Sequence, residues 1–116
     1  MARVLISEPH DDISALLELV VRRLGHEPVG SISGNVEHLG VQAAVIEPGE
    51  EVGVRIARTL RAQDVPVLFT SIYPADADLL DLKPAAYLVK PFPLYALERA
   101  LEAALQPADV RSAAAV

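Results

Sequence analysis

Short apolar runs alternate with longer amphipathic stretches along the chain, and this alternation predicts the order of its secondary-structure elements. The apolar runs are three to five residues long and are built mainly from Val, Leu, Ile and Ala, as in parallel strands that helices cover on both faces. The last run, Ala86–Val89, is apolar throughout, and we interpret it as a central strand. Five strands are expected, at residues 4–6, 28–32, 43–46, 66–70 and 86–89.

The stretches between these strands predict helices of unequal length. In the first helix, Asp11 or Asp12 can act as the cap and Gly25 as the terminator. Helices are expected over residues 11–24, 50–62 and 93–105, with a short one over 77–82 and only a stub over 36–39. Apolar residues three and four apart should face the core: Ile13, Leu16, Leu17, Val20 and Leu24, then Val52, Ile56 and Leu60, then Leu94, Leu97, Leu101 and Leu105.

Strands that alternate with helices in this way predict an α/β fold, with one parallel sheet and helices on both of its faces. A length of 116 residues suits a single domain with one core. We assign residues 1–106 to that domain and residues 107–116, which end in Ala-Ala-Ala-Val, to a flexible C-terminal tail.

Composition and charge exclude several classes of function. Ten basic and sixteen acidic residues give a net charge of −6, which argues against nucleic-acid binding. The chain has no cysteine, so disulfides and thiol chemistry are excluded. Its first apolar run reaches an acid at residue 8, too soon for a signal peptide or a membrane span. We therefore expect a cytoplasmic protein without membrane contact.

Four polar residues lie directly after predicted strands: Glu8, Glu47, Ser71 and Lys90. Because the carboxyl ends of parallel strands share one edge of the sheet, we expect these side chains to form a common pocket. The plainer alternatives are that the two glutamates are solvated acids, that Lys90 is a surface amine, and that Ser71 is a turn residue bonded to its own backbone.

Three stretches at strand ends form a recognisable set: Val4-Leu5-Ile6-Ser7-Glu8, Pro66-Val67-Leu68-Phe69-Thr70-Ser71 and Tyr87-Leu88-Val89-Lys90-Pro91-Phe92. Through them, residues 3–105 resemble the receiver domain of bacterial two-component response regulators. The resemblance implies a flavodoxin-like (βα)5 fold with strand order 2-1-3-4-5. It equates Lys90 with the lysine that precedes a proline, usually through a cis bond, and that pairs with the phosphorylated aspartate. It equates Ser71 with the residue that binds a phosphoryl oxygen, and Tyr87 with an aromatic that swings between two positions.

The chain departs from the receiver pattern at the acidic positions. Receivers hold Mg²⁺ with two adjacent acids after the first strand, whereas this chain has Glu8-Pro9, and proline offers no side-chain oxygen. Glu47 stands where the phosphoacceptor aspartate is expected, with its oxygens one methylene further out. A misplacement of ~1 Å can cost ~10²-fold in rate. We expect no metal or other cofactor; Glu8 and Glu47 are the candidate Mg²⁺ ligands, and Asp11 or Asp12 could replace the missing acid.

These departures lead to the hypothesis that Glu47 is not phosphorylated and pairs permanently with Lys90. The chain would then be a stand-alone, atypical receiver-like domain of phosphorelay signalling and not an enzyme. It would act on a protein partner, a histidine kinase or a downstream effector, and the last helix could also support a homodimer. One alternative is a conventional Mg²⁺-dependent phosphorylated receiver.

A second alternative is an enzyme or small-ligand binder on the same scaffold. Against it, the chain has no phosphate-binding G-x-x-x-x-G-K-[ST] or G-x-G-x-x-G loop and no G-x-S-x-G elbow.

The remaining polar residues have simpler interpretations. His10, His26 and His38 share no helical face and are expected to be surface or capping residues, not metal ligands. The row Arg55, Arg58 and Arg61 predicts a solvated helix face, with contact to an acidic partner as the alternative. Tyr87 is expected to be static, with its hydroxyl in water.

Overall fold

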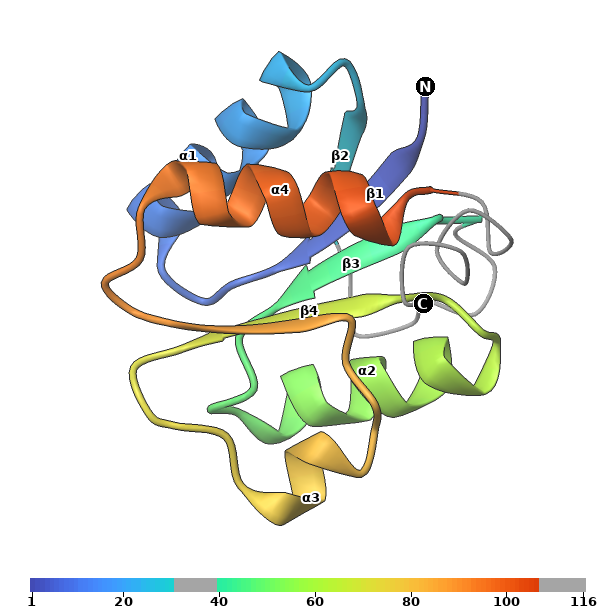
Figure 1. Ribbon diagram of the computed structural model, residues 1–116, viewed down its shortest axis with the longest axis vertical. Helices are drawn as coiled ribbons and strands as arrows, with labels where there is room; N and C mark the ends of the chain where they lie inside the picture. Colours follow the sequence, from blue (N-terminus) through green and yellow to red (C-terminus); the bar gives the residue numbers. More distant parts are fainter. Residues whose placement is uncertain (31–39, 107–116) are drawn as a thin grey trace.

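A parallel sheet lies between two layers of helices (Figure 1). The computed structural model describes residues 1–30 and 40–106. Its strands are β1 (Arg3–Ser7), β2 (Glu27–Gly30), β3 (Ala43–Ile46), β4 (Val67–Ser71) and β5 (Ala86–Val89). Its helices are α1 (Asp11–Arg23), α2 (Glu51–Ala62), α3 (Ala77–Leu80) and α4 (Leu94–Ala104).

The strand order is β2-β1-β3-β4-β5, and every neighbouring pair is parallel. The register aligns Ser7 with Ile46 and Ser71 with Val89, so the strands end at one common edge. This arrangement confirms the predicted α/β class and strand order.

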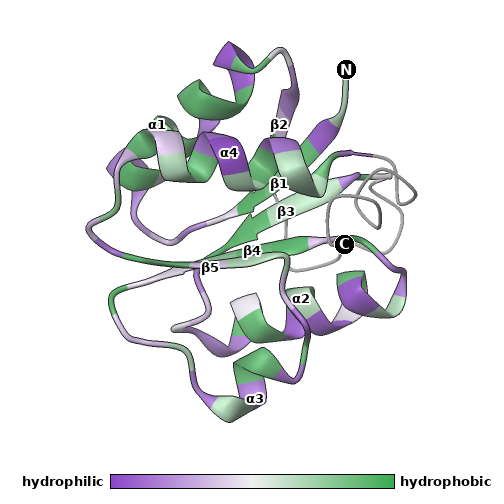
Figure 2. Cartoon of the chain, viewed as in Figure 1, coloured by the Kyte–Doolittle hydropathy of each residue, from purple (hydrophilic) through white to green (hydrophobic). Residues whose placement is uncertain are grey.

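Helices α1 and α4 cover one face of the sheet, and α2 and α3 cover the other (Figure 1). Figure 2 shows hydrophobic colour concentrated on the strands between these layers. The core is aliphatic, with Phe69 as its one fully buried aromatic among the described residues. On the α1 and α4 side the core contains Val4, Leu17, Val20, Leu68, Leu97 and Leu101; on the other side it contains Leu5, Ile46, Ile56, Leu60, Val67 and Phe69.

The ends of α1 show one prediction confirmed and one wrong. Gly25 terminates the helix with φ +86°, and the amide of His26 donates to the carbonyl of Val21 at 3.1 Å. The cap was predicted at Asp11 or Asp12, but the N-cap is His10, because its carbonyl already accepts the first helical hydrogen bond. Both aspartates lie in the first turn instead, where their charge is favourable to the helix dipole.

Three predictions of burial are wrong. The strand β5 was interpreted as central, yet it has a neighbour on one side only and its Val89 is 44% exposed. Leu16 and Val52 were expected in the core, but each helix turns a neighbouring position inward. The buried residues are Leu17, Val20 and Val21 in α1, and Gly53, Ile56, Ala57 and Leu60 in α2.

Several predictions fall outside the described residues. They are the end of the second strand at residues 31–32, the helix stub at 36–39 with His38, and the tail at 107–116. Among the described helices, none combines the length and the apolar character needed to cross a membrane.

Gly53 sets how closely α2 approaches the end of β3. A Cβ atom at this position would overlap the backbone carbonyl oxygen of Glu47 and lie 3.2 Å from Cγ2 of Ile46. The absence of a side chain therefore allows the first turn of α2 to pack against the residue that carries the Glu47 carboxylate.

Gly53→Ala should destabilise the fold by about 1–3 kcal/mol, because the added methyl must displace backbone. In an unconstrained helix the same change would stabilise the protein by about 0.5–1 kcal/mol. The sign of the change in the free energy of unfolding therefore distinguishes a close approach from an open one. Chemical denaturation measures it, with Gly30→Ala as a matched control, since a Cβ at Gly30 meets no atom within 4 Å. A stabilised Gly53→Ala variant would contradict the close approach.

Candidate functional site

Lys90 is held at the carboxyl edge of the sheet by its own backbone. It follows the last residue of β5, and its amide donates to the carbonyl of Ser71 on β4 at 2.7 Å. The Lys90–Pro91 peptide bond is cis, as the receiver resemblance implies. The backbone at Lys90 is thus fixed at the end of an edge strand, from which the ammonium reaches across the sheet.

The Lys90 ammonium contacts carboxylates from two other strands. Its Nζ lies 2.9 Å from Oε1 of Glu8, after β1, and 3.4 Å from Oε2 of Glu47, after β3. The side chains are strongly shielded, with exposed fractions of 0% for Glu8, 12% for Glu47 and 18% for Lys90. We call Glu8, Glu47 and Lys90 the ion cluster.

Each carboxylate of the ion cluster has a second donor for its other oxygen. Glu8 Oε2 accepts from the amide of His10 at 3.3 Å and lies 3.2 Å from its Nδ1. Glu47 Oε1 accepts from the amide of Gly49 at 2.5 Å, within the turn that ends β3. All four carboxylate oxygens are therefore engaged by protein donors.

The ion cluster stabilises the charged form of both Glu8 and Lys90. Burial alone would raise the pKa of the Glu8 carboxyl, but hydrogen bonds from Lys90 and His10 outweigh it and hold the pKa below its ordinary 4.5. Burial alone would lower the pKa of Lys90, but the hydrogen bond and charge of Glu8, assisted by Glu47, raise it above its ordinary 10.5. Both groups are charged at neutral pH.

Ser71 and Tyr87 are joined through a loop residue, not through the ion cluster. The Ser71 hydroxyl accepts from the amide of Tyr73 at 3.1 Å. This bond is the one expected if Ser71 is a turn residue bonded to nearby backbone. The Tyr87 hydroxyl was expected in water, but it donates to the carbonyl of Tyr73 at 2.9 Å, because the loop after β4 passes beside it. Its ring packs against Phe69 with centroids 6.0 Å apart.

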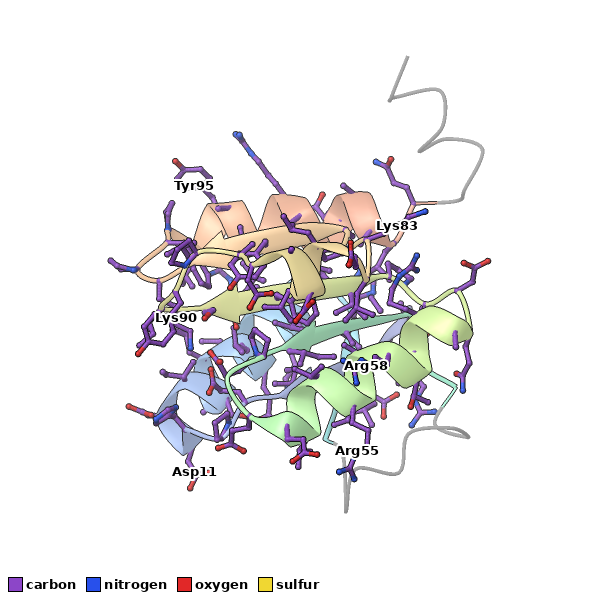
Figure 3. The ribbon with its side chains drawn as sticks, turned by 90° about the horizontal axis from the view of Figure 1, so that it is seen from below. Asp11, Arg55, Arg58, Lys83, Lys90 and Tyr95 are labelled. Carbon is purple, nitrogen blue, oxygen red and sulfur yellow. The ribbon has the colours of Figure 1, made fainter. Side chains whose placement is uncertain are left out.

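The donor set of this edge does not fit a divalent metal ion. The Lys90 ammonium already lies against both carboxylates, and Pro9 supplies no side-chain oxygen. Asp11 does not replace the missing acid, because its side chain points away from Lys90 (Figure 3). Across residues 1–30 and 40–106, no group of three or more His, Cys, Asp or Glu side chains is arranged to hold a metal.

The sequence pattern identified all three members of the ion cluster but missed two residues around them. The contact of Lys90 with Glu47 was predicted, whereas the shorter contact with Glu8 was not singled out. His10 was treated as an isolated histidine; its position two residues after Glu8, at a helix start, was the available signal. Gly53 could have been noticed as a glycine in the first turn of a helix beside Glu47.

The ion cluster should make stability depend on pH at both extremes. The contribution of Glu8 is complete above about pH 4.5 and is lost as pH falls through the lowered pKa of the folded state. The contribution of Lys90 is complete below about pH 10.5 and is lost as pH rises through its raised pKa.

Glu8→Gln should therefore lower the free energy of unfolding by about 1.5–3 kcal/mol near neutral pH, because Lys90 loses its shorter charge-assisted hydrogen bond but keeps its contact with Glu47. The difference from wild type should shrink as pH falls below about 4.5. Urea denaturation from acid to neutral pH measures both curves. A difference that stays constant with pH would show that the Glu8 charge is not what stabilises the fold.

Solved structures, but no family models and no curated proteins, match the chain. The receiver domain of a sensor histidine kinase from Pseudomonas aeruginosa PAO1, with magnesium in its active-site cleft, is 22% identical, with TM-score 0.75 over 90% of this chain and 97% of that one. The response regulator TrrA from Thermotoga maritima, in complex with Mg²⁺-BeF, is 22% identical, with TM-score 0.75 over 90% of this chain and 100% of that one. A receiver domain from Clostridium thermocellum is 15% identical, with TM-score 0.73 over 91% of this chain and 98% of that one. The fold of this chain is the flavodoxin-like fold of receiver domains.

Proposed function

We propose that the chain is an atypical receiver domain of two-component signalling, in which Glu47 stands in place of the phosphoacceptor aspartate. It acts by contact with a protein partner, a histidine kinase or a downstream effector. The observation that carries this proposal is the position of the Lys90 ammonium, 2.9 Å from Glu8 and 3.4 Å from Glu47. In receivers the equivalent lysine pairs with the aspartate that carries the phosphoryl group.

The geometry of Glu47 argues against its use as a nucleophile. One oxygen lies against the Lys90 ammonium and the other accepts from the Gly49 amide. Attack on a phosphorus atom needs a carboxylate oxygen in line with the leaving group, together with a divalent ion that neutralises the phosphoryl oxygens. The first condition is not met, because both oxygens of Glu47 are engaged. The second is not met either, because Pro9, which follows Glu8, offers no side-chain oxygen to a divalent ion. The ion cluster instead favours one fixed arrangement of the carboxyl edge.

Exposed apolar side chains support a protein partner. Large apolar residues that are 44–67% exposed occur in the loop after β4, in α3, at the end of β5 and at the start of α4. They are Ile72, Tyr73, Leu80, Val89 and Tyr95. Aromatic residues of this kind are enriched where proteins meet.

Wild-type protein incubated with acetyl phosphate and Mg²⁺ should show no mass increase of one phosphoryl group, because Glu47 is engaged and the second acid is missing. Intact-protein mass spectrometry provides the measurement, with a conventional receiver in a parallel reaction to show that the phosphodonor is active. A phosphoryl group located on Glu47 would refute the proposal and favour a conventional receiver.

The double change Pro9→Asp with Glu47→Asp should introduce phosphorylation, because it supplies the second acid and shortens the acceptor by one methylene. The single changes are the matched controls and should give much less product, since each restores only half of the pattern. Beryllofluoride and Mg²⁺ should likewise shift amide resonances near Lys90 only in the double variant. A folded double variant that shows neither response would mean that these residues do not occupy the receiver positions.

A further inference from the structure

A second polar site lies at the opposite end of the sheet from the ion cluster. There a cavity of about 660 Å³ opens where β4 and β5 begin, between the end of α2 and the end of α4. Its lining includes three charged residues, Arg61, Asp64 and Lys83, and three alanines of α4, Ala100, Ala103 and Ala104. We call this cavity the base groove. Figure 3 shows Lys83 beside the C-terminal end of α4, far from Lys90.

Two cationic side chains line the base groove, Arg61 and Lys83. The Arg61 guanidinium donates from Nε to the carbonyl of Leu82 at 2.9 Å and from Nη1 to that of Val65 at 3.4 Å. Because Lys83 follows Leu82 in the chain, these bonds hold the Arg61 head close to the Lys83 backbone. Within the described residues, neither cation forms an ion pair with a carboxylate, although Asp64 also lines the groove. An anion that contacts both side chains would have its charge balanced from two sides.

The apolar side of the base groove is built from small side chains. Ala100, Ala103 and Ala104 are spaced as i, i+3 and i+4 on α4 and therefore lie on one face of the helix. No aromatic residue is among the lining, so a small molecule would lack the enclosing walls of a typical ligand pocket. Short side chains instead let the backbone of another segment approach closely.

We propose that the base groove binds an acidic segment of a partner protein. A Glu or Asp carboxylate of that segment lies between Arg61 and Lys83, and its small apolar residues pack on Ala100 and Ala103, since Ala104 is itself buried in the core. Charge complementarity supports this occupant, because the groove presents two cations that have no ion pair within the described residues against one acid, Asp64, on a chain whose net charge is −6. The proposal does not depend on the ion cluster, so it can fail or succeed separately from the proposed signalling role.

An NMR titration tests the proposal with two synthetic peptides, Ac-Ala-Glu-Ala-Ala-Glu-Ala-Ala-amide and the same sequence with Gln in place of Glu. The acidic peptide should shift the amide resonances of Lys83, Ala103 and Ala104, and the neutral peptide should not. Lys83→Gln should weaken binding about two- to fivefold, as expected for one exposed ion pair. Arg58→Gln removes the same charge from an exposed position of α2 outside the groove and should leave binding unchanged.

Four results would overturn the proposal. They are no shift in the base groove at millimolar peptide, equal weakening by Lys83→Gln and Arg58→Gln, the same shifts with inorganic phosphate alone, or a shift of the Lys83 amide on removal of residues 107–116 without any peptide. The second would mean unspecific charge attraction, the third a site for small anions, and the fourth occupancy by the chain's own C-terminal residues.

Discussion

The buried carboxylate of Glu8 is the constraint on which the carboxyl edge of the sheet depends. Its side chain is fully shielded from solvent, so its charge must be balanced within the protein. Lys90, 82 residues further along the chain, supplies that balance. The contact joins the end of β1 to the end of β5, two strands that are not neighbours in the sheet. Removing Lys90 leaves two shielded carboxylates without a counter-charge, and an uncompensated buried charge typically costs about 3–5 kcal/mol. Removing Glu8 costs less, because Lys90 still contacts Glu47.

The same contact decides what the edge can do chemically. A carboxylate edge of a parallel sheet is suited to a cation. Here the cation is the ammonium of Lys90, tethered to the chain by β5 and oriented by the backbone bond to Ser71. A tethered cation is always present and does not require a side-chain oxygen at residue 9, where Pro9 has none. The proline at residue 9 and the engagement of Glu47 are therefore compatible parts of one arrangement.

Local patterns were sufficient for much of the fold and insufficient where neighbours in space decide. The bounds of β3 and β5 were predicted from apolar runs. The role of Gly25 as the terminator of α1 was predicted from its position after a periodic stretch. The edge position of β5 did not follow from its composition, because Ala86–Val89 is as apolar as a central strand. In the site, strand ends identified Glu8, Glu47 and Lys90. Which acid lies closer to Lys90 depends on side-chain direction across three strands, which no local pattern contains.

The two ends of the sheet differ in how completely their charges are satisfied. At the carboxyl edge, every oxygen of Glu8 and Glu47 has a donor from the protein itself. A ligand that enters there must break existing contacts between buried groups before it forms its own, and this costs binding free energy. At the other end, Arg61 uses two donors on backbone carbonyls, and Lys83 is exposed. An anion there can contact the exposed Lys83 ammonium without displacing a carboxylate of the described residues. The end away from the ion cluster is therefore where this fold can gain more from an anionic partner.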